Sequence, residues 1–149
     1  MTATDIIQIL SGTVGTLGFS ILFNIRGRRL PVAVGGGFLS WTLYVIFMHL
    51  GLNEVLNYFV VAFLTAAYAE VMARVIKCPT TTFIMSSLVP LIPGASLYYT
   101  MRYAFVGTSN MFTHKAIYTL ELAAALAIGV IIASAAAKIV FKAHVKNHN

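Results

Sequence analysis

Residues 79–99 read PTTTFIMSSLVPLIPGASLYY, and this stretch decides the fold. It is apolar enough to lie in lipid, yet Pro90 and Pro93 each lack the amide hydrogen that an uninterrupted helix needs. The carbonyls four residues earlier, those of Ser86 and Val89, are expected to lose their helical partners. Because lipid cannot satisfy such groups, the break is expected to face protein or a water-filled cavity.

The break is predicted to lie near the middle of the bilayer. Residues 80–89 would form about 15 Å of helix and residues 93–105 about 20 Å, at a rise of about 1.5 Å per residue. Together they match a hydrocarbon core of about 30 Å with its margins. The segment is therefore interpreted as a broken membrane helix, with the break at residues 90–94 near the midplane.

The second half of this helix would begin beside Pro93, which leaves the amides of Gly94, Ala95 and Ser96 without helical partners. This end of a helix carries partial positive charge. Several secondary transporters hold an anionic substrate group at such a half-helix terminus in the middle of the membrane. A proline kink that only bends the helix is the alternative, and the geometry of the sequence supports both interpretations equally.

The side chains around the break form a candidate site for a carboxylate-bearing solute. Serine hydroxyls on both halves would add hydrogen-bonding groups to the amides, two tyrosines would line the path, and an arginine two turns further along would steer the anion. The predicted substrate-binding residues are Ser86, Ser87, Pro90, Pro93, Gly94, Ala95, Ser96, Tyr98, Tyr99 and Arg102.

The composition predicts an integral membrane protein. Of the 149 residues 59% are hydrophobic and 9% are charged, and the mean hydropathy is +0.87, whereas about 25% of residues are charged in soluble domains. The net charge of +6 is interpreted as membrane topology, and no nucleic-acid partner is expected. The single cysteine, Cys78, excludes an internal disulfide and a cysteine-based metal cluster. No cofactor or metal ion is expected.

The hydrophobic segments predict an all-α membrane protein, a bundle of about five transmembrane helices. Short polar joints separate the segments, one of them from Gly107 to Lys115. Residues 1–149 would form a single integral membrane domain. The predicted spans are residues 6–23, 31–50, 55–73, 80–105 (broken near 90–94) and 116–141.

Small residues predict where neighbouring helices approach one another closely. The stripe in the last span is interpreted as a helix-packing seam rather than a substrate path. The small residues are Gly12, Thr16 and Ser20 in the first span, residues 35–37 in the second, and Ala125, Gly129, Ala133 and Ala137 in the last.

Glu70 shares one face of the third span with Ala62, Ala66 and Arg74, because these residues are each four apart. A carboxylate on a packed face can act as a proton or substrate relay, or it can form an ion pair with Arg74 at the cytoplasmic surface. The closeness of Arg74 and Lys77 to the end of the span favours the ion pair. Glu70 and Arg74 are therefore the predicted coupling or ion-pair residues.

Several features of the chain resemble the threonine/serine exporter family. They are Gly18-Phe19 and Phe23-Asn24 at the end of the first span, Glu70-x-x-x-Arg74 before Pro79, and Val89-Pro90-Leu91-Ile92-Pro93-Gly94 followed by Tyr98 or Tyr99. The resemblance covers nearly the whole chain. Specifically, the chain resembles the short membrane unit that forms the C-terminal half of full-length exporters and that occurs elsewhere as a separate small subunit. The Pro-x-x-Pro-Gly core is its most specific part.

The resemblance implies export of small hydroxy amino acids driven by the proton motive force, with dicarboxylates such as succinate associated with two-subunit members. It also implies a location in the lipid bilayer of the bacterial cytoplasmic (inner) membrane. The expected partner is a larger exporter subunit, which carries the family's other half with a cytoplasmic portion and membrane helices of its own. A homo-oligomer is the alternative assembly.

Two functional classes are alternatives to transport. An enzyme is not expected, because the sequence has no His-Glu-x-x-His pair, nucleophile elbow or phosphate-cradling glycine loop. A structural or assembly subunit without a substrate site of its own is the second class. The histidines lie at predicted span ends or in the tail, without the spacing of metal ligands, and they are His49, His114, His144 and His148.

We predict five crossings, with the N-terminus outside and the C-terminus in the cytoplasm. This topology places only Arg102 and Lys115 outside, a bias of eight basic residues to two, whereas a re-entrant fourth segment would give seven to three. Cysteine-accessibility labelling at Asn149 tests the topology, and labelling from the outside of intact cells would contradict it. The eight basic residues placed inside are Arg26, Arg28, Arg29, Arg74, Lys77, Lys138, Lys142 and Lys146.

Overall fold

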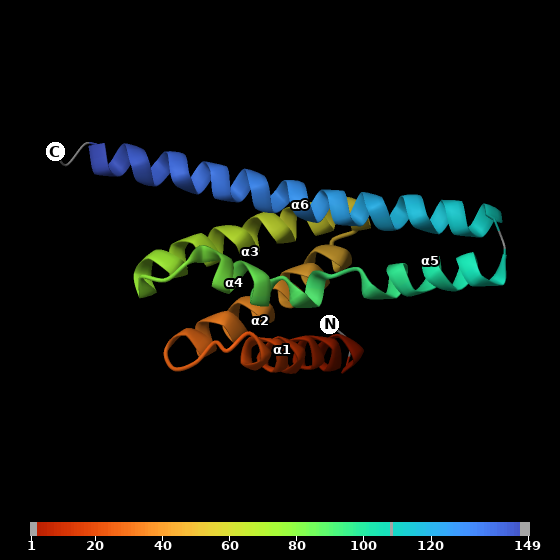
Figure 1. Cartoon of the computed structure of the whole chain (residues 1–149), viewed down its shortest axis with the longest axis horizontal. Coiled ribbons are helices and arrows are strands. Elements are labelled where there is room, and N and C mark those ends of the chain that lie inside the picture. Colours follow the sequence, from red (N-terminus) through yellow and green to blue (C-terminus); the bar gives the residue numbers. More distant parts are fainter. Residues whose placement is uncertain (1–2, 108, 147–149) are drawn as a thin grey trace.

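The computed structural model describes the backbone of residues 3–107 and 109–146, and the side chains of these residues up to residue 141. This part of the chain folds into helices and contains no strand, as the sequence predicted. The elements in Figure 1 are α1 (Ala3–Leu22), α2 (Arg29–His49), α3 (Glu54–Ile76), α4 (Thr80–Ser87), the 3-10 turn η1 (Val89–Leu91), α5 (Gly94–Val106) and α6 (Ser109–Lys146).

The helices have the length and composition of membrane spans. Four segments are each long and apolar enough to cross a bilayer, namely α1, α2, α3 and residues 109–141 of α6. The helices on either side of the break make a fifth candidate, which bends by 44°. The chain is therefore a multi-pass membrane protein, in agreement with the predicted bundle of about five helices.

The last helix begins earlier than predicted. The polar joint predicted from Gly107 to Lys115 is helical over most of its length, because α6 starts at Ser109. Gly107 has a φ of +76°, a left-handed conformation that glycine adopts readily and that ends α5. Polar residues then continue into α6, whose 38 residues span about 57 Å. A helix of this length extends beyond the hydrocarbon core, where polar side chains are tolerated.

The centre of the fold is α3, which packs against α2, α4 and α6, while α1 packs mainly on α2. In contrast, α5 packs chiefly on α6, and the two extend past α1 and α2 in Figure 1. Thr119 of α6 shares hydrogen bonds with Ser96 at 2.8 Å and with Thr100 at 3.0 Å. We call α5 with residues 109–119 of α6 the α5–α6 hairpin.

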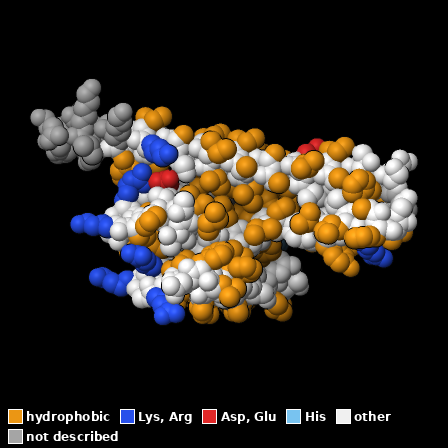
Figure 2. Space-filling view, viewed as in Figure 1, with side chains coloured by type: hydrophobic (Ala, Val, Ile, Leu, Met, Phe, Trp, Pro, Cys, Tyr) orange, Lys and Arg blue, Asp and Glu red, His pale blue; other side chains and the backbone are white. Residues whose placement is uncertain are grey.

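Basic side chains gather at one end of the molecule, which we call the basic end (Figure 2). The α1–α2 and α3–α4 loops lie there. Arg102 and Lys115 lie on the α5–α6 hairpin instead. The side chains of Lys142 and Lys146, and the whole of Asn149, lie outside the described residues. The basic residues in or beside these two loops are Arg26, Arg28, Arg29, Arg74 and Lys77, and Lys138 lies one turn before Phe141, the α6 residue that contacts Arg74.

Glycines of α2 bring α1 and α4 into close contact, as predicted. A Cβ atom added at Gly37 would lie 2.6 Å from the Cβ of Thr16, and one added at Gly36 would lie 2.8 Å from the Cβ of Ser87. Thr16 and Ser87 are both fully buried. The first half of the broken span is therefore held inside the bundle by contacts that leave no room for a side chain on α2.

The small-residue stripe of α6 packs on α3, which confirms the predicted seam. A Cβ atom added at Gly129 would lie 2.6 Å from the carbonyl oxygen of Phe59. Ala125 and Ala133 on the same stripe are buried, and Ala137 is half-buried. The backbones of α3 and α6 therefore approach each other closely along this stripe.

We predict that Gly37→Ala destabilises the bundle and that Gly18→Ala does not. The new methyl group at position 37 would overlap Thr16, so α1 and α2 must separate, and overpacking of this kind costs about 1–3 kcal/mol. No atom lies within 4 Å of a Cβ atom added at Gly18. Thermal unfolding in detergent measures both effects. Combining Thr16→Gly with Gly37→Ala should recover part of the loss, and equal stability of the two single variants would contradict the packing.

Candidate functional site

The break between α4 and α5 consists of the turn η1 and an extended residue, Ile92. The amide of Leu91 donates to the carbonyl of Leu88 at 2.9 Å, and the amide of Ile92 donates to the carbonyl of Val89 at 3.2 Å. The carbonyl of Ser86 also accepts a hydrogen bond, at the end of α4. The prolines remove the usual donors of the Ser86 and Val89 carbonyls, as expected, but neither carbonyl is left without a partner. The amide of Leu88 donates to Ser86, and in the 3-10 turn the amide of Ile92 donates to Val89 from three residues later instead of four.

The amides at the start of α5 are only partly free. The amide of Gly94 donates to the carbonyl of Ile92 at 2.7 Å, so the expectation that it would be unpaired is wrong. The amides of Ala95 and Ser96 belong to the first turn of α5, where helix geometry supplies no internal acceptor. Gly94 and Ala95 are exposed. The positive end of α5 is therefore open on one side of this chain.

Pro90 packs at the mid-height of α1 and α2. A Cβ atom added at Gly12 would lie 3.6 Å from the Cβ of Pro90 and 3.4 Å from Cγ of Trp41. Gly12 lies near the centre of α1 and Trp41 near the centre of α2, and each of these helices is about 30 Å long. The break is therefore deep in the bundle rather than at one of its ends.

The predicted hydroxyl groups fall into two separate environments. Ser86 and Ser87 are fully buried. The hydroxyl of Ser86 donates to carbonyls of its own helix, and that of Ser87 donates to the carbonyl of Ala33 at 3.5 Å. Ser96 lies beyond the break and shares its hydrogen bond with Thr119 of α6. The structure therefore does not bring Ser86 and Ser87 together with Ser96.

The remaining predicted residues lie around the break or on the exposed side of α5. Pro90 and Pro93 are half-buried, whereas Tyr98, Tyr99 and Arg102 are exposed. The Tyr98 and Tyr99 rings meet edge-on, with 5.5 Å between their centroids. No contact joins these α5 side chains to the buried hydroxyls of α4 among the described residues, so a site that used both sets would need a second surface opposite α5.

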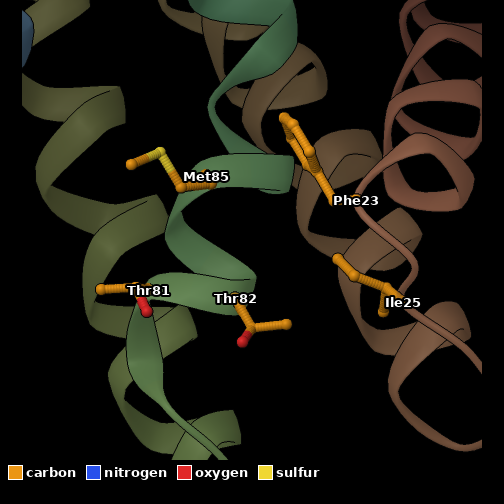
Figure 3. Close-up of a pocket in the computed structure, with 5 residues that line it drawn as sticks. All are labelled: Phe23, Ile25, Thr81, Thr82 and Met85. Atoms are coloured by element: carbon orange, nitrogen blue, oxygen red, sulfur yellow. The ribbon is translucent and has the colours of Figure 1, made fainter.

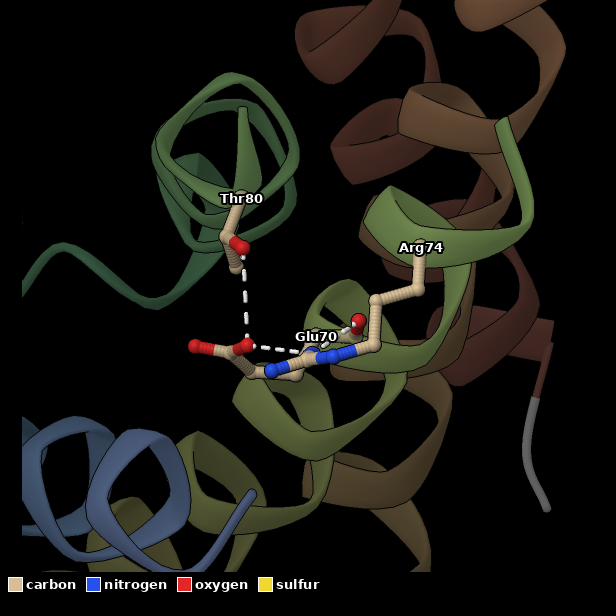
Figure 4. A network of polar contacts seen from close by, with 3 residues as sticks. All are labelled: Glu70, Arg74 and Thr80. Atoms are coloured by element: carbon tan, nitrogen blue, oxygen red, sulfur yellow. Dashed lines mark hydrogen bonds and ion pairs between the residues drawn. The ribbon is translucent and has the colours of Figure 1, made fainter. Parts of the chain in front are cut away.

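Glu70 and Arg74 form an ion pair that reaches three helices (Figure 4). The carboxylate oxygen Oε2 of Glu70 lies 2.6 Å from Nη1 of Arg74, and the hydroxyl of Thr80 in α4 donates to the same oxygen at 3.4 Å. The guanidinium group of Arg74 also lies 4.0 Å from the ring centroid of Phe141 in α6. The side chain of Glu70 is 6% exposed and that of Arg74 is 33% exposed. The arginine therefore connects a buried carboxylate to the basic end.

A pocket of about 360 Å³ lies between the end of α1 and the start of α4. The lining residues are Phe23 and Ile25 after α1 and Thr81, Thr82 and Met85 of α4, and Figure 3 shows Thr82 extending toward Ile25. Sequence reasoning missed these hydroxyl groups. The run of three threonines directly after Pro79 was the available signal, because hydroxyls in the first turn of a membrane helix lie close to the aqueous boundary.

A second carboxylate cluster, around Glu54, was also missed. Tyr118 of α6 donates a short hydrogen bond to Oε2 of Glu54, and Tyr44 of α2 donates to Oε1 at 3.4 Å. In the sequence, Glu54 lies between the predicted spans 31–50 and 55–73. No local spacing relates the three residues, so the cluster becomes visible only when the helices are packed.

Comparison with known proteins identifies one family. A family model described as "Threonine/Serine exporter, ThrE" matches residues 8–136, which is most of the chain. No curated protein and no solved structure matches it.

We predict that Arg74→Gln destabilises the protein more than Glu70→Gln. The first change leaves a buried carboxylate without its partner, which costs about 3–5 kcal/mol, whereas the second leaves a partly exposed guanidinium group that water can still reach. Neutralising both residues should recover much of the loss. The free energy of unfolding in detergent measures the coupling, with Lys77→Gln as the control. Losses that simply add in the double variant would argue against the ion pair.

Proposed function

Because this chain belongs to the threonine/serine exporter family, we propose that it is the small membrane subunit of a secondary exporter for small carboxylate-bearing solutes. Threonine-like and serine-like amino acids are the first candidates, and dicarboxylates are the second. Export is coupled to the proton motive force. The observation that carries this proposal is the broken span, whose second half begins inside the bundle with its positive end open on one side.

The start of α5 is suited to a carboxylate. The amides of Ala95 and Ser96 point out of the first turn, and a helix N-terminus attracts an anion by about 0.3–1 kcal/mol when exposed and by up to about 2 kcal/mol when partly buried. The amide of Gly94 is already paired with Ile92. In this proposal Gly94 therefore contributes open space for the solute rather than a hydrogen bond.

We place the basic end in the bacterial cytoplasm, because basic residues collect on the cytoplasmic side of membrane proteins. The N-terminus then lies outside and the chain crosses the inner membrane five times. The pocket beside Thr81 and Thr82 lies near this end and has room for a small amino acid. It would receive the solute from the cytoplasm before the solute reaches the break.

Glu70 is the proposed coupling residue at the basic end. Its carboxylate holds Arg74 and Thr80, and so it connects α3 to the first turn of α4. Protonation would remove the charge on which these contacts depend. The first half of the broken span would then be free to shift relative to α3.

The exposed side of α5 supports a partner. Lipid can cover its apolar side chains, but lipid offers no hydrogen-bond acceptors to the free amides of its first turn. A larger exporter subunit that carries the family's other half would supply the missing surface opposite Tyr98, Tyr99 and Arg102. A homo-oligomer is the alternative source of that surface.

An assembly subunit without a substrate site is the second candidate function. The observation that favours it is the separation of Ser86 and Ser87 from Ser96, since the buried hydroxyls are already engaged in contacts within the bundle. In that case the partner alone would bind the solute. The family is one of transporters, so we propose no enzymatic activity.

We predict that replacing both Pro93 and Gly94 with alanine abolishes most export while leaving assembly intact. The new residues would allow the helix to continue through the break and would remove the open positive end of α5. A loss of about 1–2 kcal/mol of binding corresponds to a fall of roughly 5-fold to 30-fold in affinity. Export of threonine and serine from cells that contain both subunits measures the effect, with Gly18→Ala as the control.

The same experiment separates the two candidate functions. A double-alanine protein that inserts, associates with its partner and exports at the unmodified rate would show that the break is only a kink, and the assembly role would then be preferred. Loss of export together with loss of insertion or association would also count against a binding site, because the defect would then be structural.

A further inference from the structure

Glu54, the first residue of α3, connects three helices at the end of the bundle opposite the basic end. Tyr118 of α6 and Tyr44 of α2 each donate a hydrogen bond to its carboxylate. The ring of Tyr58, one turn further along α3, meets the Tyr44 ring edge-on at 5.5 Å. Among the described residues no Lys, Arg or His forms an ion pair with Glu54. The two tyrosine hydroxyls therefore stabilise its charge.

Other titratable groups lie near the cluster on each element that packs there. On α6 the Nζ of Lys115 lies 5.0 Å from the centroid of the Tyr118 ring, and Glu121 is exposed three residues beyond Tyr118. On α2, His49 lies 3.4 Å from Asp5 of α1. None of these groups replaces the hydroxyls as a partner of Glu54.

The bond between Tyr118 and Glu54 holds the α5–α6 hairpin to the bundle. Within the described residues it is the only hydrogen bond between the hairpin and α2 or α3. The hydrogen bonds of Thr119 with Ser96 and Thr100 join α5 to this part of α6. We therefore expect the two segments to move together. On the other side, the break at residues 92–94 separates α5 from α4. The hairpin is therefore joined to α4 only through the break, continues into the rest of α6, and has one hydrogen bond to α3, at Tyr118.

A buried hydrogen-bond acceptor without a donor lies one turn from Glu54 on α3. Asn57 lies on the same face of α3, three residues after Glu54, and it is fully buried. Its Nδ2 donates to the carbonyl of Tyr44 at 3.0 Å, but its Oδ1 has no hydrogen-bond donor. A buried acceptor without a donor is unusual in a folded protein. A protonated carboxyl group at position 54 would supply one.

We propose that Glu54 is a proton-binding residue whose charge holds the α5–α6 hairpin against α2 and α3, and that its protonation releases the hairpin and opens the start of α5 to the solution at this end. The inference rests on the proposed export function and adds to it a proton site at the end opposite Glu70. We call Glu54, Tyr44 and Tyr118 the Glu54 latch.

The proton comes from water at this end and adds to a carboxylate oxygen of Glu54, while both tyrosines keep their own protons. The neutral acid no longer strengthens the hydrogen bonds from Tyr44 and Tyr118, and its new O–H group can donate to Oδ1 of Asn57. Lower pH at this end therefore opens the hairpin.

A distance measurement in the full chain tests the latch. Cys78→Ala removes the native thiol, and spin labels are placed at Leu50 near the end of α2 and at Phe105 near the end of α5, both of which are exposed. In liposomes, the distance distribution should shift to longer values as the pH is lowered. Glu54→Gln should show the longer distances at neutral and at acidic pH. If Glu54→Gln keeps the unmodified distances and their pH response, the latch does not exist.

Variants of three neighbouring residues show whether the distance change depends on Glu54 and Tyr118 or on another titratable group. Glu121→Gln, which removes a neighbouring carboxylate, should behave like the unmodified protein. Tyr118→Phe removes one hydroxyl and preserves the ring, so it should show the longer distances at neutral pH, and unchanged distances would overturn the role of Tyr118. His49→Gln should retain the pH response, and loss of the response there would assign the effect to the His49–Asp5 pair.

The outcome is independent of the export assay. A pH-dependent hairpin that needs Glu54 would support the latch even if the chain exported nothing. A hairpin that does not respond to Glu54 would overturn the latch and leave the export proposal unaffected.

Discussion

Backbone polar groups inside a bilayer need hydrogen-bond partners from the protein, because lipid supplies none. The two prolines of the broken span remove two such partners, and the rest of the structure depends on how they are replaced. The turn η1 meets this need by pairing the carbonyls of Leu88 and Val89 with nearer donors. The glycines of α2 allow α4 to lie close enough for its serines to be buried. The first half of the span is thereby enclosed in the bundle. The second half emerges from the break with its first turn open on one side.

The two carboxylates of α3 connect it to α6 at opposite ends of the bundle. At the basic end, Glu70 holds Arg74, which also lies over a ring of α6. At the other end, Glu54 accepts a hydrogen bond from Tyr118 of α6. The alanine and glycine seam keeps the two helices in close contact between these points. A transporter must open one end while the other is closed, and separate titratable contacts at the two ends are suited to that requirement.

Local patterns in the sequence predicted what local geometry determines. The apolar segments gave the spans, and the four-residue spacing of Glu70 and Arg74 predicted an ion pair that the structure contains. The triple glycine of α2 predicted close helix contacts, although its partners Thr16 and Ser87 lie on other helices. These results follow because a helix of known period determines which residues share a face.

Features that depend on packing or on local relaxation could not be predicted in this way. Counting four residues back from a proline overlooked the 3-10 turn, which rescues the Val89 carbonyl. Polar residues after Gly107 predicted a joint between two spans but not that most of this joint belongs to α6. The Glu54 latch joins residues from three helices, which no spacing along the chain relates.

The central claim is that the start of α5 contacts the transported solute, and protection of a cysteine at Ala95 tests it most directly. The Ala95→Cys protein, with Cys78 replaced by alanine, is alkylated by a water-soluble maleimide in membranes that contain the complete exporter. We expect threonine or serine to slow alkylation at position 95 and to leave unchanged the alkylation of an Arg28→Cys control, which is exposed in the α1–α2 loop. Equal rates at position 95 with and without a saturating concentration of solute would contradict the account.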